Sequence, residues 1–102
     1  MTKKLTTILL STLAVLTFAA SAQADTPGVD KRQRNQAERI YNGVANGDLS
    51  FRETRKLIRG QIHNRRLEKR FKSDGVVTGF ERFRLHNSLN NQSARIYRKK
   101  HN

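Results

Sequence analysis

A pattern of eleven residues occurs twice in this chain, 28 residues apart, and it limits the possible folds more than any other feature. The first copy runs from Gly47 to Leu57 and the second from Gly75 to Leu85, and an Asn or Asp precedes each glycine. Glycine accepts the left-handed backbone conformation that a tight turn requires. The repeat therefore predicts two turns, each followed directly by the start of a helix.

Each copy also contains the residues of a capping box. Ser50 and Thr78 are predicted N-caps whose hydroxyl groups accept a hydrogen bond from a free helical N–H. Glu53 and Glu81 follow three residues later, where a carboxylate can accept from the N–H of the cap residue. Both carboxylates also lie in the first turn, at the positive end of the helix dipole.

The spacing of apolar residues predicts three helices, over residues 31–44, 50–71 and 78–97. On the first helix the predicted apolar face is Ala37, Ile40, Tyr41 and Val44. On the second it is Phe51, Thr54, Leu57, Ile58, Gln61 and Ile62, with Leu67 and Phe71 on another face. On the third it is Leu85, Leu89, Gln92 and Ile96, with Phe80 and Phe83 near the start of the helix. We expect an all-α fold, a three-helix hairpin or small bundle. Duplicated helical units also pair between chains, so a homodimer is a further expectation.

The first and last predicted helices resemble each other. The segment from Asn35 to Tyr41 is similar to the segment from Asn91 to Tyr97, and the offset is 56, which is twice 28. These two helices are therefore expected to take related positions around the middle helix. Gly60 lies inside the middle helix, where it indicates either a close helix contact or a weak point.

Residues 1–24 have the layout of a cleavable secretory signal peptide. Lys3 and Lys4 precede an apolar stretch, and Ala22-Gln23-Ala24 is a small-x-small cleavage site. We expect cleavage before Asp25, and a periplasmic location in a Gram-negative cell or secretion. The remaining chain is then a flexible leader over residues 25–30 and a single basic helical domain over residues 31–102, which is not expected to span a membrane.

The charge of the chain favours anionic partners. After removal of residues 1–24 the chain has 19 basic and 8 acidic residues, a net charge of +11, and 13 of the basic residues are Arg. Such an excess attracts polyanions or acidic protein surfaces. Because secretion separates the protein from the nucleoid, an anionic envelope polymer or an acidic protein is the expected partner, and a natural nucleic-acid target is not.

A row of cations is the strongest candidate for a binding site. Successive spacings of three or four residues place all its members on one face of the middle helix, and Arg can donate two parallel hydrogen bonds to a phosphate or carboxylate. The alternative is a solvated face that only keeps the protein soluble. The row, called here the Arg stripe, consists of Arg52, Arg55, Arg59, His63, Arg66 and Arg70.

The sequence gives little support to catalysis or to a cofactor. There is no Cys, no Gly-rich phosphate loop and no serine in a nucleophile-elbow motif. The two turns resemble degenerate EF-hand loops, with Glu53 and Glu81 at the last ligand position, but Arg70 and Lys72 occupy ligand positions of the second loop. We therefore expect no enzyme, no metal ligand and no cofactor.

The two capping segments, Leu49 to Glu53 and Val77 to Glu81, are similar to the Leu-Thr-x-x-Gln element of the Spy/CpxP group of periplasmic stress proteins. This chain has Glu where that group has Gln, and it is shorter. The resemblance implies an all-α, chaperone-like protein that binds clients as a dimer.

Three functional interpretations follow. The first is a non-catalytic, stress-related binding protein that holds anionic envelope components or acidic clients on the Arg stripe. The second is a structural or regulatory module that docks one acidic protein partner. The third is a metal-responsive protein that uses the EF-hand-like loops.

Overall fold

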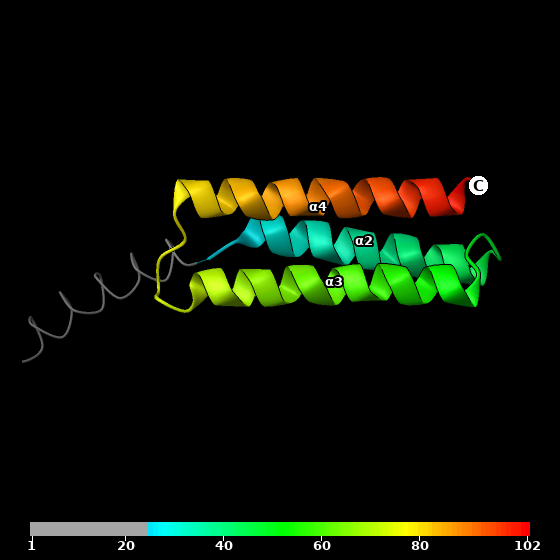
Figure 1. The fold of residues 1–102 in the computed structure, drawn as a ribbon, viewed down its shortest axis with the longest axis horizontal. Coiled ribbons are helices and arrows are strands. Elements are labelled where there is room, and N and C mark those ends of the chain that lie inside the picture. The colour runs from blue at the N-terminus through cyan, green and yellow to red at the C-terminus, as the bar shows by residue number, and fades with distance from the viewer. Residues whose placement is uncertain (1–24) are drawn as a thin grey trace, which may run out of the picture.

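Residues 25–102 form three long helices in a computed structural model, and nothing is described of residues 1–24. The helices are α2 (Pro27–Ala45), α3 (Phe51–Lys72) and α4 (Gly79–Lys100). They lie side by side, with α2 and α4 running in one direction and α3 in the other (Figure 1). The predicted all-α three-helix bundle is confirmed, whereas the predicted signal peptide lies outside the described residues.

Both predicted turns and both capping boxes are present. Gly47 and Gly75 have φ angles of 77° and 84°, in the left-handed region that favours glycine. The Ser50 hydroxyl accepts from the N–H of Glu53, and the N–H of Ser50 donates to the Glu53 carboxylate. Thr78 and Glu81 make the same pair of hydrogen bonds at the start of α4. The duplicated sequence pattern therefore corresponds to a duplicated structural unit.

The 28-residue period extends to all three helices. A shift of 28 residues takes a position in one helix to the corresponding position in the next helix, because the two turn glycines, Gly47 and Gly75, are 28 residues apart. Matching positions on α2, α3 and α4 are each buried: Val29, Leu57 and Leu85; Gln36, Asn64 and Gln92; and Ile40, Glu68 and Ile96. The relation expected between the first and last helices thus holds for the middle helix as well.

The core consists of two apolar clusters with a polar layer between them. Val29, Leu67, Phe71, Val77, Leu85 and Leu89 form one cluster, and Ile40, Leu49, Leu57 and Ile96 form the other. In the layer between them the Gln92 amide donates to the Leu57 carbonyl at 2.7 Å, and the Gln36 amide donates to the Leu89 carbonyl at 2.9 Å. Because buried amides without partners destabilise a core, these bonds also fix how the helices align.

The first helix begins earlier than predicted. A flexible leader was expected over residues 25–30, but the helix begins at Pro27, and Thr26 and Val29 are buried. Proline suits the first helical position because its fixed φ is helical and no N–H is needed there. The apolar spacing did not indicate this earlier start, because Val29 is the only apolar residue between Pro27 and Ala37 if Gly28 is left aside.

The predicted apolar faces are only partly buried. Ile40 on α2 and Leu57, Leu67 and Phe71 on α3 belong to the core, as expected. Leu85, Leu89, Gln92 and Ile96 are buried on α4 as expected, but Tyr41 is 72% exposed on α2 and Phe51 is 80% exposed on α3. Val44, Ile58, Ile62, Phe80 and Phe83 are exposed as well. Glutamines, an asparagine and a glutamate occupy core positions on α2 and α3 instead, so apolar spacing alone pointed to the neighbouring side of each helix.

Candidate binding surface

The Arg stripe lies on the outer side of α3. All six members are exposed, and the buried residues Leu57, Asn64 and Phe71 lie on the opposite side of the helix. The regular spacing of α3 therefore aligns the six side chains along one solvent-facing edge, as the sequence predicted.

The stripe has no acidic partner within the described chain. Within residues 25–102, the ion pair found within 4 Å joins Lys72 to Glu68, and neither residue belongs to the stripe. Two stripe members instead contact aromatic rings: the Arg55 guanidinium lies 5.8 Å from the Phe51 ring centroid, and that of Arg70 lies 6.0 Å from the Phe71 ring centroid. Such contacts hold an Arg side chain without neutralising its charge.

Other arginines join α2 to α4. Arg32 donates to the Asn90 side-chain oxygen at 2.6 Å, and Arg39 donates to the Ser93 hydroxyl at 2.7 Å. These two arginines therefore have a structural role that the stripe members lack. Sequence reasoning could not separate the two groups, because the partners lie more than 50 residues away.

A groove opens between α2 and α3. It has a volume of about 750 Å³. It exists because α4 packs extensively against both other helices, while α2 and α3 contact each other less. We call it the α2/α3 groove, and it is lined by Asp30, Gln33, Arg34, Ala37, Ile40, Tyr41, Val44, Thr54, Ile58, Gln61, Ile62 and Arg65.

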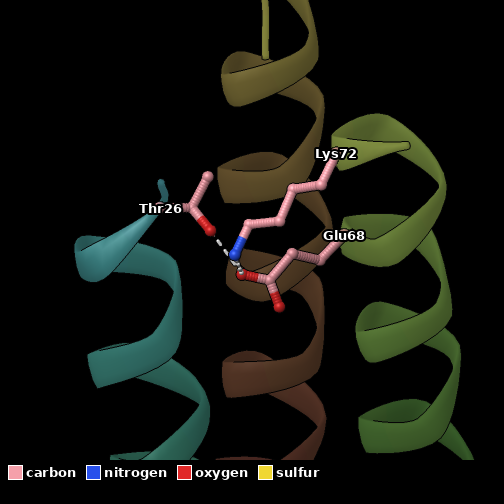
Figure 2. Close-up of polar contacts among 3 residues, drawn as sticks. All are labelled: Thr26, Glu68 and Lys72. Carbon is pink, nitrogen blue, oxygen red and sulfur yellow. Dashed lines mark hydrogen bonds and ion pairs between the residues drawn. The ribbon is translucent and has the colours of Figure 1, made fainter. Parts of the chain in front are cut away.

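A polar cluster ties the start of α2 to the end of α3 (Figure 2). The Thr26 hydroxyl donates to Oε2 of Glu68, and Lys72 Nζ lies 3.3 Å from the same oxygen. Thr26 occupies the N-cap position of α2, yet its side chain makes no capping hydrogen bond to its own helix. It binds the neighbouring helix instead, so the cluster fixes the end of the bundle.

Asp30 and Glu68 titrate as a pair in this cluster. The hydrogen bond with Glu68, together with burial and the nearby Glu68 charge, raises the pKa of Asp30. Burial acts to raise the pKa of Glu68 too, but hydrogen bonds from Thr26, Asp30 and Lys72 outweigh it and lower that pKa. Asp30 therefore holds a proton more readily than an isolated Asp, while Glu68 stays ionised.

The EF-hand-like loops use their glutamates for capping. The N–H of Ser50 is the main cause of the lowered pKa of Glu53, and the side chains of Ser50 and Asn102 add to it. Across residues 25–102, no three His, Asp or Glu side chains lie close enough together to hold a metal ion. Within those residues, the metal-responsive interpretation therefore has no ligand set in its support.

A comparison with known proteins found no relative of this chain. No protein-family model, characterised protein or solved structure matches this chain. The similarity to the Spy/CpxP group therefore rests on the two capping segments alone. Among the described helices, none combines the length and the apolar character needed to cross a membrane.

Proposed function

We propose that this protein is a non-catalytic binding protein of the periplasm or of the secreted fraction, and that its Arg stripe binds anionic envelope polymers or acidic client proteins. A role in envelope stress would agree with the resemblance to the Spy/CpxP group. The proposed location depends on the predicted signal peptide of residues 1–24.

The observation that carries this proposal is a row of cations without acidic partners. From Arg52 to Arg70 the stripe extends roughly 27 Å at the helical rise per residue. Like charges three or four residues apart destabilise a helix slightly. A face that served solubility alone could mix both signs at no such cost. Anionic groups spaced along a polymer would neutralise the row and release their counterions.

The test measures binding to purified lipopolysaccharide and to inorganic polyphosphate over a range of salt concentrations. The stripe variant carries Arg55→Gln, Arg59→Gln and Arg66→Gln. A matched control carries Arg98→Gln, Lys99→Gln and Lys100→Gln, which removes the same charge from the end of α4. We expect the stripe variant to lose at least about tenfold in affinity and to show a shallower salt dependence, because fewer counterions are released.

The control distinguishes binding at the Arg stripe from attraction by the net positive charge of the protein. If both triple variants weaken binding equally, net charge alone accounts for the affinity and the proposal fails. It also fails if the stripe variant binds as well as the unaltered protein.

Docking of one acidic protein partner is the second candidate. Phe51, Ile58 and Ile62 are exposed next to the stripe, and a protein partner could cover them together with the arginines. An interface with an apolar centre loses less affinity in salt than a polyelectrolyte complex does. Weak salt dependence with retained sensitivity to the stripe variant would therefore favour this candidate.

A further inference from the structure

The α2/α3 groove has the residue spacing of a helix-packing surface. Each of its two helices carries a second row of residues beside its buried row, with alternating spacings of three and four. These spacings are those of the contact positions of a coiled coil, where side chains of one helix fit between those of another. The second rows are positions 30, 34, 37, 41 and 44 on α2, and 54, 58, 61 and 65 on α3.

Apolar side chains that line the groove are exposed in the monomer. Tyr41 and Val44 on α2 face the groove from one side, and Ile58 and Ile62 on α3 from the other, and all four are exposed. Two facing helices with unfilled heptad rows have the geometry that accepts one more helix and so completes a four-helix bundle. An acyl chain is another ligand that could fill an apolar groove, but it would need only an apolar surface and not this heptad spacing.

An unpaired polar atom lies beside the groove. Gln33, which lines the groove floor, is only 8% exposed, and its Nε2 has no hydrogen-bond acceptor. A buried donor without an acceptor is costly.

The charges at the groove favour an acidic occupant. Arg34 and Arg65 line it, and the one carboxylate there, Asp30, is hydrogen-bonded to Glu68. A second copy of this chain is a poor match, because Asp30, Glu53, Glu68 and Glu81 are already bonded and Glu38 is the only other acidic residue in the three helices. Residues 1–24 contain no Asp or Glu, so this segment is not an acidic occupant of the groove either.

We propose that the α2/α3 groove binds an amphipathic α-helix of a partner protein, with an apolar heptad face and acidic flanks. The Arg stripe is not needed for this interaction, because its six residues lie outside the groove lining. The inference is therefore separate from polyanion binding on the stripe, although it shares Ile58 and Ile62 with the second candidate above.

The test uses three labelled synthetic peptides of 18 residues, with binding followed by fluorescence anisotropy. The first has an apolar heptad face flanked by Glu, the second has Lys in place of Glu, and the third is the Glu peptide with two central prolines. Binding of the Glu peptide at least about tenfold tighter than either of the others is expected, because only it combines the helix with the matching charge.

Matched variants then locate the site. The double variant Ile58→Gln and Ile62→Gln removes apolar side chains from the groove, and Phe80→Gln with Phe83→Gln removes exposed apolar side chains from α4. We expect the groove variant to lose at least about tenfold in affinity for the Glu peptide and the α4 variant to lose less than about threefold. All four residues are exposed, so both proteins should fold, as circular dichroism can verify.

Two further measurements keep the outcomes distinct. Arg34→Gln with Arg65→Gln should abolish the preference for the Glu peptide over the Lys peptide, whereas the stripe variant should keep it. NMR of the unaltered protein should show the Tyr41 ring signals shifting as the Glu peptide binds, with Tyr97 unaffected. Equal binding of all three peptides overturns the proposal, and so does a dimer in sedimentation that the groove variant dissociates, because a second copy would then fill the groove.

Discussion

The side-chain amide of Gln92 occupies the space directly beside the α-carbon of Gly60. A β-carbon added to Gly60 would lie 2.1 Å from Gln92 Oε1. Glycine inside a helix costs about 1 kcal/mol relative to alanine. Here it allows Gln92 to reach across from α4 and donate to the Leu57 carbonyl and to Gln61 Oε1. Of the two interpretations of Gly60 from sequence, the close helix contact is confirmed.

Replacing Gly60 with alanine should destabilise the protein even though alanine favours helix. The new methyl group would displace the Gln92 amide, which is fully buried and bonded to Leu57 and Gln61. The loss of these bonds and the overpacking, about 1–3 kcal/mol, should outweigh the gain of about 1 kcal/mol in helix propensity. Urea unfolding followed by circular dichroism measures the effect.

Gly79→Ala is the matched control, because no atom lies within 4 Å of a β-carbon placed there. Its expected effect is neutral to slightly stabilising. Equal effects from the two substitutions would show that Gln92 does not limit the space at Gly60.

The two capping boxes should contribute similarly to stability. Ser50→Ala and Thr78→Ala each remove the hydroxyl that accepts from the third helical N–H, and we expect each to lower the free energy of unfolding by about 1 kcal/mol. Ser73→Ala, at the exposed end of α3, should change it by less than about 0.5 kcal/mol. A loss confined to one of the two caps would contradict their equivalence.

Stability should depend on pH through the pair formed by Asp30 and Glu68. Because the folded state raises the pKa of Asp30, the contribution of this group is present in acid and is lost as pH rises through that raised pKa. Asp30→Asn should therefore stabilise the protein at pH 7, since the amide can still donate to Glu68. The gain in stability from Asp30→Asn should shrink as the pH falls below 3.8, the ordinary pKa of Asp.

Glu68→Gln should have the opposite effect. The folded state lowers the pKa of Glu68, so its contribution is present at neutral pH and is lost as pH falls through the lowered pKa. Thermal unfolding of both variants from pH 3 to pH 8 tests the two signs. Parallel pH curves for the two variants would show that the carboxyl groups are not coupled.

Neutralising part of the Arg stripe should leave the fold intact. The variant with Arg55→Gln, Arg59→Gln and Arg66→Gln removes like-charge neighbours at positions i and i+4, each worth a few tenths of a kcal/mol at low salt. We expect unchanged or slightly higher stability, with the difference fading at high salt. A large loss of stability would mean that these arginines have a structural role.

The sequence by itself predicted the parts of this fold that depend on near neighbours. A turn glycine, a cap hydroxyl and a glutamate three residues later interact within one helical turn, so their spacing in the chain is their spacing in space. The exposed Arg stripe follows in the same way from the helical repeat. Leu85, Leu89, Gln92 and Ile96 were also predicted as one buried face.

Tertiary structure alone decided which side of α2 and α3 is buried. Gln36, Asn64 and Glu68 are in the interior because each finds a partner on another helix, 24 to 53 residues away in the chain, and no local pattern encodes such partners. Once these polar groups occupy the core, Tyr41, Ile58 and Ile62 are left along the α2/α3 groove. Packing among three helices, rather than the apolar spacing of any one helix, therefore created the groove to which we propose that a partner helix binds.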